Sequence, residues 1–238
     1  MTGKIYFYSA LIIYFLISPL TYAASLQVYP VNINFSVGEN VKAIYVNNTG
    51  VDPISAQVRV YQWTQKNGSD VLSETHSLLV SPPITAIPPG KQQLLRVILP
   101  VPPAGGAEQA YRLVVDELPG TSQNGNQTVR FLLRYDLPVF INTPASVINL
   151  SQVVFHLDTS AVPERLWIEN NSSQHLKLSN VVLSSAGHHY PVNKGLLGYV
   201  LAKSTRSWTL PKGHYSGSTL TFNVNDNAET QTVPVVSP

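Results

Sequence analysis

Apolar and polar residues alternate along much of the chain, with the period of two that is typical of half-buried β-strands. The longest alternating segment is 129–140, where every odd position is apolar or aromatic and three even positions are charged. Such a segment carries one continuous apolar ridge over about twice the length of a typical strand. An unpaired apolar edge of this length recruits other chains. Either the strand is central and merely long, or its unpaired half is presented to a partner, and we favour the second interpretation.

Shorter segments of the same kind fill the rest of the first half. The pattern predicts strands at 26–29, 31–35, 41–46, 54–61 and 93–99. Gly, Pro and Asn residues separate these strands and mark turns. No segment of this half has sustained helical periodicity, so the pattern predicts an all-β protein.

A hairpin is expected in the middle of the chain. Residues 110–119 form an apolar run, and the Gly- and Asn-rich loop 120–128 returns the chain as the segment 129–140. Just beyond it we expect a hinge at 142–146. Pro144 holds the preceding residue in extended geometry, and the Ala and Ser that follow it add little packing.

The second half repeats parts of the first. Residues 166–173 resemble residues 43–50, and each of these segments is followed by an alternating strand. Later, residues 201–210 occupy the place that residues 87–95 have in the first half. Two copies of one strand order predict two immunoglobulin-like β-sandwich domains of about 100 residues each.

Residues 1–23 have the pattern of a secretory signal peptide. Lys4 precedes a predominantly apolar run, and small residues precede a cleavage site after Ala23. The run is shorter than the ~20 residues that span a bilayer. We therefore expect an exported protein with no membrane insertion of the mature chain, and domains at 24–143 and 147–238.

Composition narrows the possible functions. The chain has 15 Lys and Arg against 13 Asp and Glu, a formal net charge of +2, which gives no reason to expect nucleic acid or an anionic membrane as a partner. It has no cysteine. An exported chain without disulfides is held by its cores alone, and thiol catalysis and cysteine–zinc sites are excluded.

No motif predicts catalysis. The sequence has no nucleophile elbow, no phosphate-cradling Gly loop and no His-Glu-x-x-His. His188 and His189 are adjacent, so on a strand they point to opposite faces and cannot both bind one ion, and Asp116 and Glu117 diverge in the same way. We expect no enzymatic activity, no cofactor and no metal site.

Three arginines interrupt strands that are otherwise apolar: Arg96, Arg112 and Arg134. A charge in such a strand needs a partner or a solvated cleft. The arginines could lie on a solvated face and pair across strands, for instance with Asp116 or Asp136, or they could line a binding cleft. The residues alone leave both possibilities open.

Four short motifs occur in a characteristic order along the chain, at residues 79–83, 89–97, 111–119 and 134–140. In this order they resemble the periplasmic pilus assembly chaperones of the chaperone–usher pathway, the PapD-like superfamily, and most closely its archaic, spore-coat-U-type branch. The resemblance covers the whole mature chain. It implies two immunoglobulin-like domains arranged as a boomerang, a periplasmic location, and two partners, pilus or fimbrial subunits and an outer-membrane usher.

The resemblance also implies a use for the long alternating segment. Pilus subunits are immunoglobulin folds that lack their last strand, and a chaperone of this family lends the last strand of its own first domain. The lent side chains here would be Val129, Phe131 and Leu133, with Tyr135 continuing towards the chaperone's own core. Strand addition of this kind takes affinity from the backbone ladder and specificity from alternate side chains.

Members of the family bind the terminal carboxylate of the subunit with basic residues in the cleft between domains. This sequence departs from the better-known members, because residues 26–35 contain no basic residue and Pro138 stands where they have a lysine. The candidates for the carboxylate anchor are Arg96, Arg134 and Arg112. Arg96 and Arg134 are favoured, on the expectation that both reach one carboxylate and because a guanidinium suits a carboxylate.

Two other functions remain open. The chain could be a pilus subunit itself, although a subunit should have one incomplete domain and a donor extension at its start. It could also be an exported two-domain β-sandwich binding or adhesion module with an aromatic platform. Against such a platform, Trp63, Trp167 and Trp208 are expected to fill sandwich cores or flank strand ends.

Overall fold

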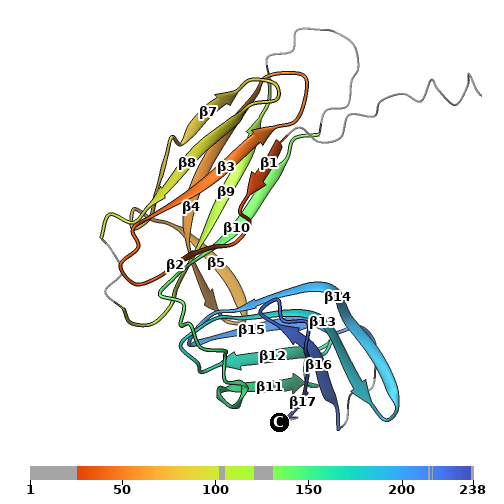
Figure 1. Cartoon of the computed structure of the whole chain (residues 1–238). Helices are drawn as coiled ribbons and strands as arrows, with labels where there is room; N and C mark the ends of the chain where they lie inside the picture. Colours follow the sequence, from red (N-terminus) through yellow and green to blue (C-terminus); the bar gives the residue numbers. More distant parts are fainter. Residues whose placement is uncertain (1–25, 102–104, 121–130, 214, 216, 237–238) are drawn as a thin grey trace, which may run out of the picture.

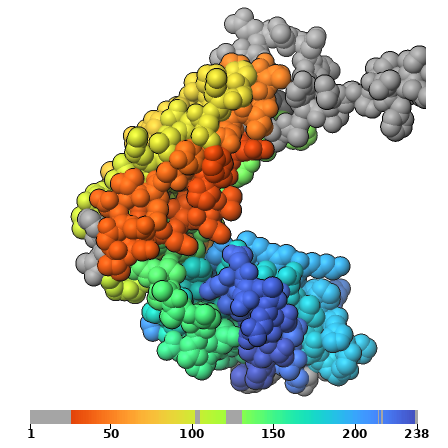
Figure 2. All heavy atoms as spheres, viewed as in Figure 1, coloured from red at the N-terminus to blue at the C-terminus, as the bar shows by residue number. Residues whose placement is uncertain are grey.

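The computed structural model describes residues 26–101, 105–120, 131–213, 215 and 217–236. They form two β-sandwiches joined at a bend (Figure 1). The bend leaves a concave side between the first sandwich, in red to yellow, and the second, in blue (Figure 2). Across these described ranges, no helix has the length and apolar character needed to cross a membrane. The all-β class and the two immunoglobulin-like sandwiches predicted from the sequence are confirmed.

The first sandwich consists of two sheets. One has the strand order β1–β3–β8–β6, and the other has the order β2–β10–β9–β4–β5 with β7 paired to β4. The chain changes sheets between β1 and β2, where Pro30 interrupts the ladder. The strands are β1 (Leu26–Tyr29), β2 (Ile33–Phe35), β3 (Val41–Asn48), β4 (Ile54–Lys66), β5 (Ser69–Glu74), β6 (Leu79–Ser81), β7 (Ile84–Ile87), β8 (Gln92–Ile98), β9 (Gln109–Leu118) and β10 (Arg134–Ile141).

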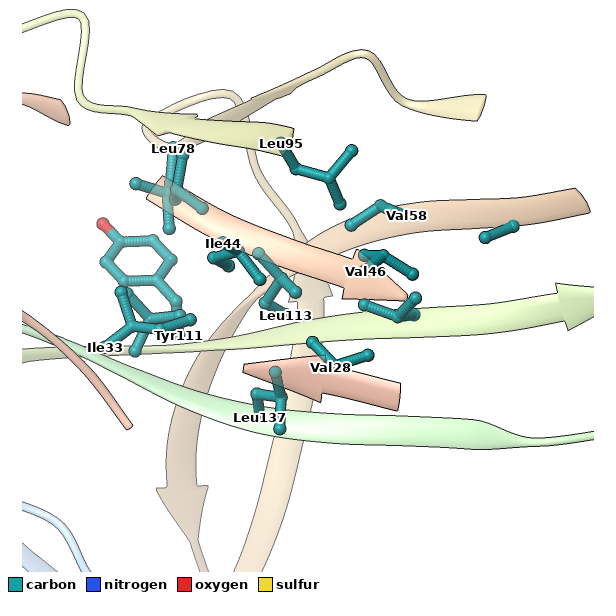
Figure 3. Packing of buried hydrophobic residues seen from close by; sticks show 14 of the residues in the cluster. Val28, Ile33, Ile44, Val46, Val58, Leu78, Leu95, Tyr111, Leu113 and Leu137 are labelled. Carbon is teal, nitrogen blue, oxygen red and sulfur yellow. The ribbon is translucent and has the colours of Figure 1, made fainter. Parts of the chain in front are cut away.

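Alternate residues of these strands fill the space between the sheets. Ile44 and Val46 of β3 face Leu113 of β9 and Leu137 of β10 in a single apolar core (Figure 3). All four side chains are buried. Each such side chain stabilises the fold by about 1.5–3 kcal/mol relative to an exposed position. The period of two in the sequence is therefore the physical origin of the sandwich.

The second sandwich has sheets of order β11–β12–β15 and β14–β13–β16–β17. It opens with a short 3-10 turn, η1 (Leu150–Gln152), and its core includes Phe155 and Phe222, whose ring centroids lie 5.3 Å apart. The strands are β11 (Val153–Asp158), β12 (Arg165–Asn170), β13 (Leu176–Ser185), β14 (His188–Val200), β15 (Ser204–Thr209), β16 (Thr219–Val224) and β17 (Thr230–Pro234).

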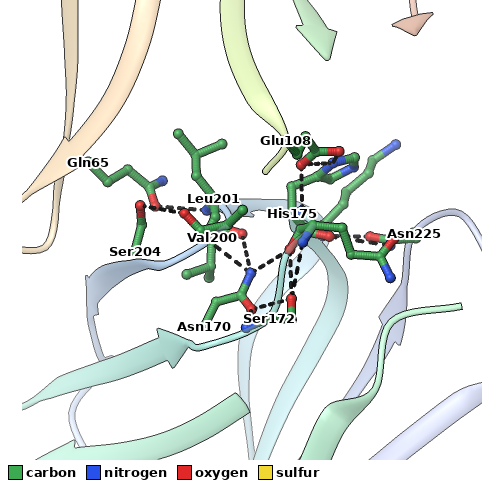
Figure 4. A network of polar contacts seen from close by, with 12 residues as sticks. Gln65, Glu108, Asn170, Ser172, His175, Val200, Leu201, Ser204 and Asn225 are labelled. Atoms are coloured by element: carbon green, nitrogen blue, oxygen red, sulfur yellow. Dashed lines mark hydrogen bonds and ion pairs between the residues drawn. The ribbon is translucent and has the colours of Figure 1, made fainter. Parts of the chain in front are cut away.

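Each sandwich has a buried asparagine at the end of one strand, with the same hydrogen bonds in both, which we call the asparagine corner. Its position corrects the alignment of the two halves that was made from the sequence. Asn48, at the end of β3, donates to the Ile87 carbonyl at 2.9 Å. Asn170, at the end of β12, donates to the Val200 carbonyl at 3.1 Å (Figure 4). Each side chain also accepts a backbone N–H two residues later. Asn48 therefore corresponds to Asn170, whereas the sequence match had placed Asn47 there.

The predicted hairpin is present, but its second strand is shorter than expected. β10 begins at Arg134 rather than at residue 129. The register of β9 and β10 would place Phe131 opposite Pro119, which has no N–H to donate. The ladder therefore ends near Leu133, whose carbonyl accepts the Glu117 N–H at 2.9 Å. Val129, the first of the predicted lent residues, lies outside the described residues.

Candidate functional site

The edge of β10 that faces away from β9 is paired only at its end. β2 runs parallel to residues 139–141 of β10 on that side. In the part of the chain that the structure describes, residues 134–138 have no neighbouring strand there. The strand follows the margin of the first sandwich down to the bend (Figure 1). An open strand edge therefore ends at the junction of the two sandwiches.

The hydrogen bonds of the neighbouring residues show which backbone groups face the open edge. The Leu133 carbonyl bonds to β9, and the Asn142 N–H donates to the Phe35 carbonyl of β2 at 3.0 Å. Backbone groups alternate sides along a strand, so odd residues of β10 bond to β9 and even residues face outward. The free groups belong to Arg134 and Asp136. Pro138, which cannot donate, stands at an outward position, where it costs the β9 ladder no hydrogen bond.

The apolar side chains before and within β10 differ in exposure. Phe131 is 83% exposed, and Leu132 beside it is also exposed. Leu133 and Tyr135 are half-buried and pack against the first core, and the Tyr135 hydroxyl donates to the Leu26 carbonyl at 2.9 Å. Of the predicted lent residues, Phe131 is thus free in this structure, whereas Leu133 and Tyr135 also contribute to the first sandwich.

Arg134 and Arg96 lie on opposite outer faces of the first sandwich. Leu95 and Val97 are in the core, so Arg96 between them points out from the β1–β3–β8–β6 sheet. Arg134 precedes the inward-facing Tyr135 and points out from the other sheet. The two sheets of a sandwich are about 10 Å apart, and these side chains point away from each other. The expectation that Arg96 and Arg134 reach one carboxylate is therefore wrong.

Arg134 already has an acidic partner. Its Nε lies 2.9 Å from Asp116 Oδ1, directly across the ladder. The other oxygen of the same carboxylate, Asp116 Oδ2, lies 2.6 Å from the Arg59 guanidinium. The two guanidinium groups are exposed and the Asp116 side chain is 19% exposed. This is the cross-strand pairing that was one of the two possibilities for the arginines. Arg134 is placed about 13 Å along the sheet from Arg112, four residues away on the β9 register.

Arg112 lies at the junction of the two sandwiches. Its guanidinium carbon is 3.6 Å from the centroid of the Trp63 ring and 5.5 Å from that of Tyr199 in the second sandwich. The side chain is only 16% exposed. Burial lowers the pKa of Arg112 and the nearby Asp136 opposes that shift. The guanidinium stays charged, because arginine titrates far above neutral pH.

The Arg112 guanidinium is poorly satisfied by the protein. Among the described residues its only ion-pair contact is with Asp136, at 3.6 Å, which is too long for a hydrogen bond. A guanidinium has five N–H donors and no acceptor function. The arrangement is therefore suited to an incoming anion, and a carboxylate can take two parallel hydrogen bonds from such a group.

Apolar and polar contacts hold the two sandwiches together around Arg112. Trp63, Phe140 and Tyr199 form a cluster with their neighbours, and the Trp63 and Tyr199 ring centroids are 5.4 Å apart. Nearby, the Glu108 carboxylate accepts the His175 backbone N–H at 2.6 Å and lies 2.9 Å from its ring Nδ1 (Figure 4). The relative placement of the sandwiches thus depends on specific side chains.

The tip of the β4–β5 hairpin also contacts the second sandwich. The Gly68 carbonyl accepts the Ser207 N–H at 3.0 Å. Gly68 has a φ of +72°, and a Cβ there would lie 2.8 Å from the Trp167 ring, so only glycine fits. On the same hairpin, Asp70 Oδ2 lies 3.1 Å from Arg206 of β15. The Asn-Gly turn is visible in the sequence, but nothing in the sequence links it to the second half.

A pocket of about 480 Å³ opens between the sandwiches on the other side of the aromatic cluster. Asn34 of β2, Phe140 of β10 and Lys177 of β13 contribute to its wall. Arg112 does not line it. The junction therefore has two faces, a pocket beside the hinge and the partly exposed Arg112 beside the open strand.

The fold and this site define a class: two immunoglobulin-like sandwiches with an open strand edge that ends beside a largely covered cation at their junction. A family model described as pili and flagellar-assembly chaperone, PapD N-terminal domain, matches residues 25–148, which is more than half of the chain. The chain belongs to this family. The resemblance noted in the sequence is confirmed, and membership favours an assembly chaperone over a pilus subunit or an adhesion module.

Solved structures of similar fold cover nearly all of the chain. The CsuC–CsuE chaperone–tip adhesion subunit pre-assembly complex from the archaic Csu pili of Acinetobacter baumannii has 24% identity and a TM-score of 0.71, over 90% of this chain and 100% of that chain. The Salmonella enterica SafA pilin complex with the SafB chaperone has 15% identity and a TM-score of 0.64, over 90% and 98%. The E. coli chaperone DraB has 18% identity and a TM-score of 0.59, over 88% and 96%. No curated protein matches the sequence.

Proposed function

We propose that this protein is a periplasmic chaperone that binds pilus subunits by lending them β10 and the residues before it, and that delivers them to an outer-membrane usher. The observation that carries the proposal is the open edge of β10, which is preceded by the exposed Phe131. Two of the similar structures are complexes of a chaperone with a pilus subunit. The signal-like residues 1–23 support export, and the two domains divide near residues 142–146.

The lent strand supplies two kinds of contact. The outward backbone groups of Arg134 and Asp136 extend the ladder of an incomplete subunit fold. Phe131 enters the groove where the missing strand of the subunit would lie. Leu133 follows it into the groove and leaves its half-buried position in the first sandwich when the subunit binds. Burying Phe131 alone contributes about 1.5–3 kcal/mol before the cost of ordering is subtracted.

Arg112 is the candidate that the geometry favours as the carboxylate anchor. It lies at the end of the open edge with its side chain only 16% exposed, and it lacks an acceptor at hydrogen-bond distance among the described residues. Arg134 is already paired with Asp116, and Arg96 lies on the opposite face. A fixed cation sets the register of the lent strand, because a slip of one residue turns every side chain to the other face.

Co-purification tests the lent strand. The protein is produced in the periplasm together with a pilus subunit, and the complex is isolated through a tag on the subunit. Phe131→Asp should abolish co-purification, since an unpaired charge in an apolar groove costs several kcal/mol. Val162→Asp, at a fully solvated valine of the second sandwich, is the matched control and should bind as wild type. Equal recovery of the Phe131→Asp variant would contradict the proposal.

Delivery to the usher requires a second surface, and the outer face of the β1–β3–β8–β6 sheet offers one. Tyr29 and Tyr45 stack there at 5.1 Å, and Leu79 is exposed. Arg96 lies on this face with no ion-pair partner in the described part of the chain. Arg96→Glu should leave subunit co-purification unchanged and reduce fibres on the cell surface. Loss of subunit binding in this variant would instead show that Arg96 contributes to the subunit-binding site.

A further inference from the structure

We propose that Trp63 and Asp70 of the first sandwich and Arg206 of the second form a positioning chain for the Arg112 guanidinium, so that the carboxylate site is complete only when the two sandwiches are docked. The inference rests on the proposed role of Arg112 as the carboxylate anchor. The three residues are positioning residues, because none of them needs to touch the subunit.

The first link is the stack of Arg112 on Trp63. The guanidinium carbon lies 3.6 Å from the ring centroid, and the Trp63 side chain is 2% exposed. A cation over a desolvated indole face is held more strongly than one at the surface. The contact covers one face of the guanidinium and leaves the N–H groups at its rim available. Trp63 thus fixes the plane in which Arg112 can donate.

The second link fixes the indole. Trp63 Nε1 donates to Asp70 Oδ1 at 2.9 Å, from β4 to β5 within the same hairpin. A buried indole N–H without an acceptor is costly, so this bond selects one orientation of the ring. The Gln65 side chain donates to the same oxygen at 2.9 Å. Asp70 therefore determines the tilt of the surface on which Arg112 rests.

The third link crosses to the second sandwich. Arg206 Nη2 lies 3.1 Å from Asp70 Oδ2, and Arg206 Nη1 donates to the Gly68 carbonyl at 3.1 Å. The two oxygens of one carboxylate are thus divided between an indole of the first sandwich and a guanidinium of the second. Separation of the sandwiches would remove Arg206 from Asp70, and it would also remove the bonds of the Gln65 side chain to the Tyr199 carbonyl and the Leu201 N–H, so Asp70 would be held less firmly beside Trp63.

The charges of the chain point to the same coupling. Arg112 and Arg206 are like charges in one neighbourhood, and the Asp70 carboxylate offsets their repulsion. An arriving carboxylate adds a second negative group on the Arg112 side. The cluster then contains two guanidinium cations, Arg112 and Arg206, and two carboxylates, that of Asp70 and that of the ligand. Asp136 adds a longer contact with Arg112. Docking of the sandwiches and binding of the carboxylate should therefore favour each other.

The test compares two forms of one ligand. A pilus subunit is prepared by peptide ligation with either a free C-terminal carboxylate or a C-terminal amide, and both dissociation constants are measured for each chaperone variant. Wild type should prefer the acid by on the order of tenfold or more, the scale of losing one partner of a desolvated charged pair. Arg112→Ala should bind both forms equally.

Substitution of a positioning residue should change the ratio of the amide and acid dissociation constants in the same direction as Arg112→Ala does. Trp63→Leu, Asp70→Ala and Arg206→Ala should each reduce the preference for the acid towards equal affinity, and Trp63→Phe should restore part of it by keeping an aromatic face. Glu39→Ala, which removes a carboxylate paired with Lys42 at 2.7 Å, is the control and should keep the full preference. Asp70 and Arg206 are part-exposed, so they keep the test valid if Trp63→Leu does not fold.

Two outcomes separate this inference from the proposed function. If wild type binds the acid and the amide equally, Arg112 is not a carboxylate anchor, and both the anchor assignment and the positioning chain are wrong. If wild type prefers the acid, Arg112→Ala does not, and the Trp63, Asp70 and Arg206 variants keep the full preference, the anchor stands and the positioning chain is overturned. Phe131→Asp should weaken both ligands by the same factor, because it acts on the lent strand.

Discussion

The two sandwiches end differently, although they share the same asparagine corner. In the second, the chain crosses after β17 to the other sheet. There the Val236 N–H donates to the Phe155 carbonyl at 2.9 Å and its carbonyl accepts the Leu157 N–H at 2.9 Å. In the first, β10 keeps an open edge over residues 134–138, and the exposed Phe131 stands before it.

This difference shows where a strand edge is protected and where it is used. Natural sheets cover or blunt their edges, because a free edge recruits other chains. The second sandwich covers the edge of β11 with its own last residues. The first places an apolar segment and outward backbone groups on the concave side of the bend, beside the largely covered Arg112. In the described residues β17 of the second sandwich is also an edge strand, so what distinguishes β10 is the exposed Phe131 before its edge and the cation beside it. That combination is better explained by a partner than by imperfect folding.

The largest expected effect is on stability. It separates the part of the apolar ridge that packs in the first sandwich from the part that is lent to a subunit. Leu133 packs against the first core, whereas Phe131 does not. Leu133→Asp should lower the free energy of unfolding of the empty protein by about 2–3 kcal/mol, and Phe131→Asp should change it by less than about 0.5 kcal/mol. Urea unfolding followed by tryptophan fluorescence measures both.

Both variants should fail to bind subunits in the co-purification assay. Equal destabilisation by the two substitutions would place Phe131 in the core of the empty protein. No destabilisation by Leu133→Asp would mean that its half-buried position contributes nothing to the first sandwich. Either result would remove the distinction between the folded part of the ridge and the part that is lent.

Much of the fold could be predicted because burial alternates locally along each strand. The alternation at Ile44 and Val46, or at Leu137 and Val139, is visible without a structure, and it places the strands, the hairpin and both sandwiches. The start of β10 is different, since it depends on where the partner strand runs out of donors at Pro119. A ladder is a property of two segments, whereas an alternating pattern is a property of one.

The candidate site was predicted only in part for the same reason. Alternation says that Arg96 and Arg134 point outward, but it does not say from which sheet. The contact of Asp70 with Arg206 joins residues far apart in sequence, and neither residue stands in a recognisable motif. Trp63 was expected to fill a sandwich core or flank a strand end, yet it packs between the sandwiches with Tyr199.

An intermediate effect tests what the two sandwiches have in common. Asn48 and Asn170 are buried, and they donate to the backbone carbonyls of Ile87 and Val200 respectively. Asn48→Ala and Asn170→Ala should each lower the free energy of unfolding by about 1–3 kcal/mol, because each leaves buried backbone groups unpaired. Hydrogen exchange should show the loss in the first sandwich for Asn48→Ala and in the second for Asn170→Ala.

The half-buried Asn47, which the sequence match had placed opposite Asn170, accepts a solvent-exposed hydrogen bond from the Gln92 side chain and provides the control. Asn47→Ala should change the unfolding free energy by less than about 0.5 kcal/mol, as surface substitutions commonly do. A larger effect for Asn47→Ala than for Asn48→Ala would restore the alignment read from the sequence. It would also remove the argument that the two sandwiches are built around the same corner.

The smallest effect probes the open edge itself. Asp136 is an outward residue of β10, so its N–H is free for a partner and is not needed by β9. Asp136→Pro removes that donor, and Tyr135 before it is already extended, as a proline requires. Subunit affinity should fall about fivefold relative to Asp136→Ala, which keeps the N–H and loses the same contact with Arg112, since one net hydrogen bond is worth about 1 kcal/mol. Thermal unfolding of the two empty variants should coincide. If the proline variant is much less stable, Asp136 bonds to β9 and the assignment of the free backbone groups is reversed; if both variants bind subunits equally well, no partner strand pairs along this edge.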